Sequence, residues 1–371
     1  MTLVQSLYIL LLKSSLWKSA VDPTLFEGVG PNEWQNILKL STRQRTTAFI
    51  AHSIQSLPQT FLPSKSQQWK LILETEKIEE ANRRLNGMIA FLSKEYLSIG
   101  IPFVLLKGQG VALSYPDPTK RTPGDIDLFF YKEQDYPKAK EWVLRKGYEQ
   151  EPESIKHLGF NLEGIHVENH RLMATFDRPK YNRIFIKECE KIIDGDEWAE
   201  ANIDGCNLRL LPHTFNACFL FIHLFHHFIH LGISMRQLCD WMLHLSAHKN
   251  HINKQEAARL LKLLALDRPA SLFAGVAVNY LGAQPEIFPI EPLFHPVHTK
   301  KIVKDLLEGG HFGFYHPGKK RPQGLWTGRA HSYLTTVKRS VKMVGLAPEH
   351  IAYLPYYKLI NRIQCSLSPK P

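Results

Sequence analysis

Two short apolar segments, one ending in a glycine turn and the other carrying a pair of carboxylates, constrain this chain more than any other feature. Residues 101–106 form a compact apolar run that ends in Lys-Gly-Gln-Gly at 107–110. Residues 125–131 form a second apolar run, which contains Asp125 and Asp127. Runs of this length bounded by turn residues predict buried strands. Because side chains two apart on a strand point to the same face, we expect the two aspartates to stand side by side.

The aspartate pair indicates a cation site. Two adjacent carboxylates repel each other and are costly to bury unless a cation lies between them. A divalent metal ion that carries a phosphorylated substrate is the simplest reason to keep Asp125 and Asp127 on an apolar strand.

The remaining periodicity is largely helical, with a second group of strands in the middle of the chain. Helical spacing of apolar residues predicts helices over 2–18, 42–57, 66–97, 133–146, 214–230, 234–248, 254–266 and 268–281. Residues 157–162 and 165–172 are expected to form a hairpin. We therefore predict an α+β fold in which a small mixed β-sheet is flanked by N-terminal and C-terminal helical regions. The expected divisions are 1–99 (helical), 100–211 (α/β core), 212–310 (helical) and 311–371 (basic segment).

Composition excludes several classes of protein. Hydrophobic residues make up 44% and charged residues 22% of the chain, as in ordinary globular proteins. No apolar run is long enough to span a bilayer, and the stretch 7–12 lacks the features of a signal peptide. The five scattered cysteines form no CxxC pair, which argues against a disulfide framework or a thiolate zinc site. A cytoplasmic location fits these features best.

The net charge of +11 is concentrated in the C-terminal segment. The basic residues from His311 onward are Lys319, Lys320, Arg321, Arg329, Lys338, Arg339, Lys342, Lys358, Arg362 and Lys370, and the single acid is Glu349. An anionic partner such as nucleic acid, acidic lipid or polyphosphate fits this segment. A solvated basic face without a partner fits it equally well.

The central segment contains, in order, Lys107-Gly108, Tyr115-Pro116-Asp117, Arg121 and Gly124-Asp125-Ile126-Asp127-Leu128. With these motifs it resembles an uncharacterised bacterial nucleotidyltransferase family of the DNA polymerase β-like superfamily, most firmly over about 85–175. The resemblance implies an NTP substrate and Mg²⁺ (or Mn²⁺) ions held by three carboxylates. The superfamily usually has Gly-Ser after the first strand, whereas here Gly108 is followed by Gln109.

The third carboxylate that the resemblance implies is sought on the neighbouring expected hairpin. His166, Glu168 and His170 fall on one face of its second strand. Hard divalent cations prefer oxygen ligands, so we expect Glu168 to complete the catalytic and metal-binding set with Asp125 and Asp127. The alternative is that Glu168 is a solvent-facing strand residue.

Nucleotide binding is assigned to the turn after the first strand and to one arginine. Lys107 and Arg121 are expected to neutralise phosphate charge, and backbone N–H groups around Gly108 are expected to cradle the phosphates. The Gln109 amide would donate where the superfamily has a serine hydroxyl. The alternatives are a strand-end lysine that reaches water and an ordinary loop arginine.

Three other features have open interpretations. One face of the expected helix 214–230 carries four histidines, His223, His226, His227 and His230. They are interpreted either as a metal site or as histidine packing beside the cleft. In the next expected helix, 234–248, one interpretation is that Arg236 or Asp240 contacts the nucleotide or the acceptor. The other interpretation is that Arg236 and Asp240 form an ion pair with each other. The glycine–aromatic segment 309–315 is a flap, a base-stacking surface or a plain loop, and it lacks the Gly-Lys-Ser/Thr of a Walker A motif.

The leading hypothesis is a metal-dependent nucleotidyltransferase that moves a nucleoside monophosphate from an NTP to an unknown acceptor and releases pyrophosphate. The alternative is a catalytically impaired binding or regulatory protein with the same fold, which uses its basic surface on nucleic acid or membrane. A histidine-centred metalloenzyme is a third, weaker option.

Overall fold

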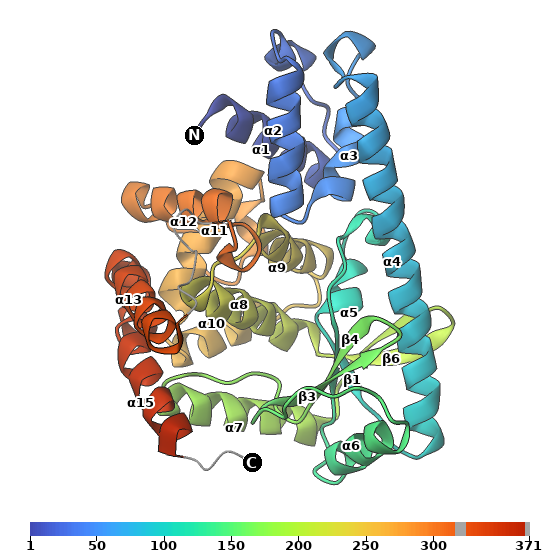
Figure 1. Ribbon diagram of the computed structural model, residues 1–371, viewed down its shortest axis with the longest axis vertical. Helices are drawn as coiled ribbons and strands as arrows, with labels where there is room; N and C mark the ends of the chain where they lie inside the picture. The colour runs from blue at the N-terminus through green and yellow to red at the C-terminus, as the bar shows by residue number, and fades with distance from the viewer. Residues whose placement is uncertain (316–323, 368–371) are drawn as a thin grey trace.

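The computed structural model describes residues 1–315 and 324–367 and contains one sheet surrounded by helices (Figure 1). The helices before the sheet are α1 (Leu3–Trp17), α2 (Pro31–Arg43), α3 (Thr47–Gln55) and the 34-residue α4 (Lys65–Ser98). Capping boxes begin α1 and α4, where Thr2 pairs with Gln5 and Ser64 with Gln67. The predicted helix 42–57 is wrong at its start, because Arg45 has a φ of 58° and separates α2 from α3.

The sheet has six strands in the order β3-β4-β2-β1-β6-β5. Their bounds are β1 (Val104–Leu106), β2 (Ile126–Phe129), β3 (His157–Leu162), β4 (Ile165–His170), β5 (Ala199–Ile203) and β6 (Cys206–Leu210). β2 pairs with β1 antiparallel and with β4 parallel, and β1 pairs with β6 parallel. The predicted mixed sheet and α+β class are therefore confirmed.

Two elements of the sheet region were not expected from the sequence. They are α7 (Pro179–Gly195) and the β5–β6 hairpin. Asp204 and Gly205 form the hairpin turn with positive φ values of 49° and 78°. An Asp-Gly turn is a strong hairpin signal, but the flanking strands are only partly buried and lack a long apolar run.

The two faces of the sheet enter different hydrophobic cores. Leu105, Ile126 and Leu128 pack with α4 and with α6 (Asp135–Arg145) on one face. Val104, Leu106 and Phe129 join a larger core formed with the other helices. Asp127 alternates with Ile126 and Leu128 along β2, so its side chain lies on the face directed away from α4 and α6.

Of the helices after the sheet, α8 (His213–His230) and α9 (Met235–Ala247) lie opposite the aspartates. The helices after the sheet also include α10 (Lys254–Leu263), α11 (Asp267–Leu281), α12 (Pro296–Gly309), α13 (Leu325–Met343), α14 (Pro348–Ile351) and α15 (Leu354–Leu367). They share one core with α1, α2 and α3, and the Trp17 indole N–H donates to the Leu281 carbonyl. The predicted divisions of the chain remain predictions, and this core contains residues from all four of them.

Part of the predicted basic surface is directed inward. Arg339 donates to both carboxylate oxygens of Asp305 at 2.8 and 2.7 Å, and Lys358 donates to the Ser332 carbonyl at 3.1 Å. Lys319, Lys320, Arg321 and Lys370 lie outside the described residues. Within the described parts of the chain, no helix combines the length and apolar character needed to cross a membrane.

Candidate active site

The turn between β1 and α5 (Gly108–Ala112) has a left-handed backbone. Lys107 has φ 48° and ψ −137°, and Gly108 has a φ of 40°. A non-glycine residue rarely adopts a positive φ, and such strain concentrates at functional sites. The Lys107 side chain is only 12% exposed, so it lies within the protein and does not extend into water as a strand-end lysine would.

Three carboxylates meet at the edge of this turn. Asp127 is the register partner of Glu168 across the parallel strands β2 and β4, and Asp125 lies two positions before Asp127. One carboxylate oxygen from each of the three lies within 4.8 Å of the others. Asp127 is buried, whereas Asp125 and Glu168 are more accessible to solvent. The structure therefore brings together the three acids that the sequence singled out.

Asp127 is held between two nitrogen groups. The Lys107 Nζ atom lies 2.9 Å from Asp127 Oδ1, and the His170 Nε2 atom lies 2.8 Å from the same oxygen. Burial alone would raise the pKa of Asp127, but Lys107 and His170 outweigh it and lower that pKa. The pKa of Lys107, which burial would lower, is raised by Asp127 and Asp125. Asp127 and Lys107 are therefore both charged near neutral pH.

Glu168 is surrounded by imidazoles. Its carboxylate oxygens lie 3.0 Å from His170 Nε2, 3.3 Å from His157 Nδ1 and 3.5 Å from His166 Nε2. Burial opposes ionisation, but the His170 hydrogen bond and the charge of Lys107 hold the Glu168 pKa well below its usual range. His157 and His170 were not selected from the sequence; the signal for His170 was its position on the same strand face as Glu168.

The three acids fit a divalent cation. Asp127 Oδ2 is buried and has no hydrogen-bond partner within the described part of the chain. A buried carboxylate oxygen without a partner is costly, and an added cation would satisfy it. All three side chains offer oxygen, the donor that Mg²⁺ and Mn²⁺ prefer.

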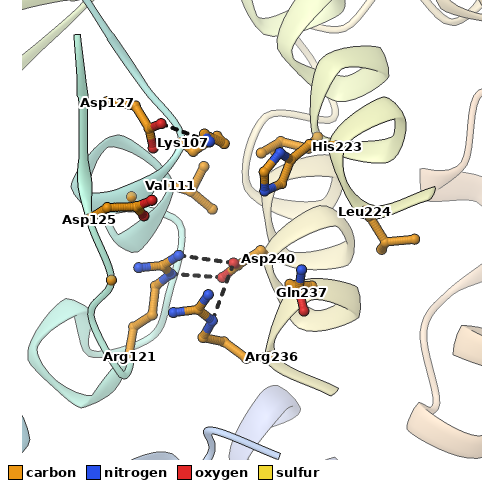
Figure 2. Close-up of a pocket in the computed structure, with 13 residues that line it drawn as sticks. Lys107, Val111, Arg121, Asp125, Asp127, His223, Leu224, Arg236, Gln237 and Asp240 are labelled. Atoms are coloured by element: carbon orange, nitrogen blue, oxygen red, sulfur yellow. Dashed lines mark hydrogen bonds and ion pairs between the residues drawn. The ribbon is translucent and has the colours of Figure 1, made fainter. Parts of the chain in front are cut away.

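A small pocket lies between these acids and the facing helices (Figure 2). Lys107, Asp125 and Asp127 line its sheet side, whereas His223 of α8 and Asp240 of α9 line the opposite side. Its volume is about 40 Å³, which is room for a few water molecules. A bound nucleotide therefore requires either movement of α8 and α9 away from the sheet or placement of its sugar and base outside the pocket.

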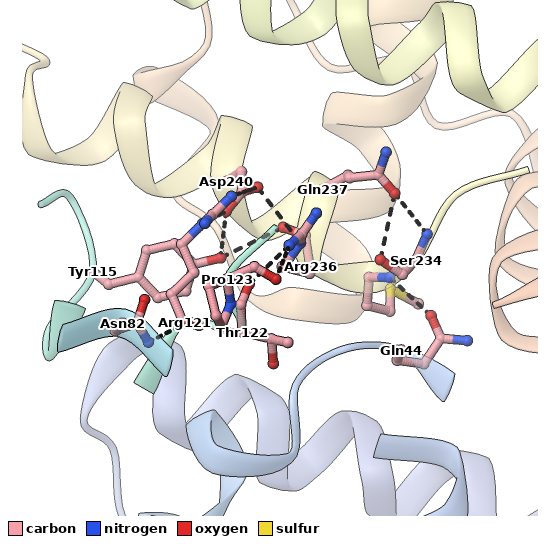
Figure 3. A network of polar contacts seen from close by, with 11 residues as sticks. Gln44, Asn82, Tyr115, Arg121, Thr122, Pro123, Ser234, Arg236, Gln237 and Asp240 are labelled. Atoms are coloured by element: carbon pink, nitrogen blue, oxygen red, sulfur yellow. Dashed lines mark hydrogen bonds and ion pairs between the residues drawn. The ribbon is translucent and has the colours of Figure 1, made fainter. Parts of the chain in front are cut away.

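Arg121 lines the pocket but has a protein partner (Figures 2 and 3). Its Nε and Nη2 atoms donate to the two oxygens of Asp240 at 2.7 and 2.9 Å, and Tyr115 donates to the same carboxylate at 2.7 Å. The Arg121 Nη1 atom is buried and, among the described residues, has no hydrogen-bond partner. Arg236 is 4.0 Å from Asp240, so the expected Arg236–Asp240 pair is secondary to the Arg121 pair.

Gln109 lies apart from the pocket. Its amide nitrogen donates to Asn86 Oδ1 of α4 at 2.7 Å, and the residue is 5% exposed. It is absent from the pocket lining, so this position does not support the expected contact between Gln109 and phosphate.

The four-histidine face of α8 is divided between two environments. His223 lines the pocket, and burial lowers its pKa well below the usual range, with the nearby charge of Lys107 adding to the effect. His226 and His230 instead lie with Asp177, a residue between β4 and α7.

The glycine–aromatic segment 309–315 ends beside α2. The ring of Tyr315 lies 4.9 Å from the guanidinium of Arg43. The three interpretations of this segment as a flap, a stacking surface or a plain loop remain open.

Comparison with known proteins decides the family. A family model described as an uncharacterised nucleotidyltransferase matches residues 30–282, which is more than half of the chain. The chain belongs to this family. A separate comparison with solved structures finds similarity to an antigenic nucleotidyltransferase-like protein from Paracoccidioides brasiliensis. The two share 15% sequence identity, the match covers 54% of this chain and 93% of that chain, and the TM-score is 0.34. No curated protein matches the chain.

Proposed function

We propose that the protein is a metal-dependent nucleotidyltransferase that transfers a nucleoside monophosphate from an NTP to an acceptor and releases pyrophosphate. The observation that carries this proposal is the convergence of Asp125, Asp127 and Glu168 within 4.8 Å beside a pocket that Lys107 also lines. Membership of the nucleotidyltransferase family supports the reaction class.

The three carboxylates are the proposed ligands for Mg²⁺ or Mn²⁺. When bound, the metal would supply charge neutralisation at the triphosphate and lower the pKa of the acceptor hydroxyl. Asp127 is held in its ionised form by Lys107 and His170, and Glu168 by its imidazole neighbours. Both side chains are therefore ready to bind a cation without first losing a proton.

Lys107 and Arg121 are the proposed phosphate-binding cations. Lys107 Nζ is already beside Asp127, so a small rotation would let it contact both this carboxylate and a phosphate oxygen. Arg121 remains paired with Asp240 and offers its Nη1 atom to a phosphate oxygen. Asp240 would therefore act as a positioning residue for Arg121. His223 is neutral and would contact substrate only as a hydrogen-bonding group.

The test is incubation of the purified protein with each labelled NTP and Mg²⁺ or Mn²⁺, followed by measurement of pyrophosphate release and of label on the protein or on added acceptors. We expect metal-dependent turnover that the Asp125→Asn/Asp127→Asn double variant abolishes. Asp194→Asn, an exposed aspartate on α7, is the matched control and is expected to keep full activity.

The second candidate is a nucleotidyltransferase-fold protein with impaired catalysis that binds an anionic partner. It is favoured by the small pocket and by the position of Gln109 against α4. It predicts no turnover with any NTP, no metal-dependent thermal stabilisation by NTP, and salt-sensitive binding to RNA or anionic vesicles.

A further inference from the structure

We propose that Asp177, His226 and His230 form a second metal site, separate from the three acids of the candidate active site, which binds a divalent transition metal such as Zn²⁺. One potential ligand atom from each residue lies within 4.8 Å of the other two. His226 and His230 are four residues apart on α8, a spacing that directs both imidazoles to one side of a helix. The carboxylate comes from a different segment, which leads from β4 to α7.

The chain segments on either side of Asp177 hold it in place. Asp177 immediately precedes Arg178, the N-cap residue of α7. The backbone N–H of Phe176 donates to Asn182 Oδ1 at 3.0 Å, which holds the segment against the first turn of α7. Asp177 Oδ2 lies 2.8 Å from His230 Nε2. The carboxylate is therefore already directed at the histidine pair.

The chemistry of the three side chains suits Zn²⁺ better than Mg²⁺. Imidazole nitrogen is a preferred ligand for zinc and other late first-row metals, whereas Mg²⁺ prefers oxygen. The Asp177 carboxylate supplies a negative charge for a dication, and the two imidazoles supply nitrogen ligands.

The exposure of the site leaves room for a fourth ligand. The side chains of His230 and Asp177 are 26% and 11% exposed, so the ligands are shielded on one side and reachable by water on the other. Three protein ligands and one water are a common coordination set for zinc. A metal here would link the segment that follows Glu168 and His170 to the helix that carries His223.

A second histidine cluster on the opposite end of α8 is a weaker metal site. His213, His244 and His248 also lie within 4.8 Å of one another. However, the rings of His213 and His248 are stacked, with centroids 3.9 Å apart and planes within 16°. Lone pairs of ring nitrogens lie in the ring plane, so stacked rings do not direct them to one point. This cluster also contains no carboxylate, and it therefore provides a control.

The experiment is to strip the full-length protein with a chelator, reload it with Zn²⁺, and measure both the zinc content and the affinity by competition with a chromophoric chelator. Four variants are compared with the wild-type protein: His230→Gln, Asp177→Asn, His248→Gln and the Asp125→Asn/Asp127→Asn double variant. Circular dichroism of the metal-free proteins checks that each variant is folded like the metal-free wild type.

We expect one zinc per chain in the wild type, in His248→Gln and in the double variant. Because loss of a group that only supports a metal ligand already costs 10–100-fold in affinity, loss of a ligand in His230→Gln or Asp177→Asn should cost more than about 100-fold. The proposal is overturned if the wild type binds no zinc, if His248→Gln or the double variant loses it, or if folded His230→Gln and Asp177→Asn both retain wild-type affinity. These results do not depend on catalysis, so they stand apart from the proposed function.

Discussion

Lys107 and Asp127 form an ion pair that is almost completely buried, with 2.9 Å between Nζ and Oδ1 and with side chains that are 12% and 1% exposed. The lysine ammonium lies beside the carboxylate that we assign to the metal. In the metal-free protein Lys107 therefore supplies part of the positive charge that keeps Asp127 ionised.

Lys107→Met should destabilise the metal-free protein by about 3 kcal/mol, because it removes the charged partner of buried Asp127 and leaves this carboxylate with His170 alone. Urea unfolding followed by circular dichroism measures this change. The control is Lys77→Met, whose pair with Glu74 is 70% and 52% exposed, and it should change the free energy of unfolding by less than about 1 kcal/mol. Mn²⁺ should stabilise Lys107→Met more than wild type; equal effects in both would contradict this account.

Glu168 should contribute to stability in a pH-dependent way. Its pKa in the folded protein lies well below the ordinary value of 4.5. The stabilisation is therefore fully present above the pKa of the unfolded chain and is lost as the pH falls from about 4.5 toward the folded pKa. The difference in free energy of unfolding between wild type and Glu168→Gln should shrink between pH 6 and pH 3, roughly the range in which the unfolded carboxyl titrates.

Glu133→Gln is the control for this pH series, since Glu133 is exposed. Its difference from wild type should stay small and nearly constant over the same range. A wild-type advantage over Glu168→Gln that grew in acid would show that the sign of the Glu168 effect is wrong.

Asp240→Asn should cost about 3–5 kcal/mol of folding free energy, because it leaves the buried Arg121 guanidinium without its charged partner. Chemical denaturation provides the measurement. Glu80→Gln removes a pair of similar length, 2.7 Å to Arg83, in which both side chains are about 60% exposed, and it should cost less than about 1 kcal/mol. Similar losses in the two variants would rule out a special role for burial of the Arg121–Asp240 pair.

Gln109→Ser should leave nucleotide affinity nearly unchanged. The Gln109 amide is directed to Asn86 and not into the pocket. Loss of that hydrogen bond should cost about 1 kcal/mol of stability, while NTP binding, measured by calorimetry, should change by less than about threefold, since 1.4 kcal/mol corresponds to tenfold. A tenfold loss of affinity would place the glutamine on the phosphates in the bound state. Asn86→Ala, which removes the partner only, separates the two effects.

Local patterns in the sequence predict much of the sheet, most of α3, and the helices α1, α4, α6 and α8 to α11, but they do not predict α7 or α12 to α15. β1, β2 and the β3–β4 hairpin follow apolar runs or partial alternation, and each forms close to its predicted position. The β5–β6 hairpin was not predicted because exposed polar residues alternate along it, and because β5, at the edge of the sheet, needs little apolar surface. α2 was not predicted, although Trp34, Ile37 and Leu40 form a buried apolar stripe at helical spacing after the Gly30–Glu33 capping contact.

The sequence by itself predicted that Asp125 and Asp127 lie together, because extended backbone directs side chains two apart to the same face. Asp125 lies one residue before β2, and its carboxylate still meets that of Asp127. Only the tertiary structure decided what meets them. Strand order places β4 beside β2 and so sets Glu168 opposite Asp127, a pairing that no local pattern encodes. α9 packs against α5, and its Asp240 pairs with Arg121, which lies 119 residues earlier in the chain. α8 places His223 in the pocket and His226 and His230 beside Asp177. Contacts at such separations depend on how whole elements bury their apolar faces, and the periodicity of any single element leaves that arrangement open.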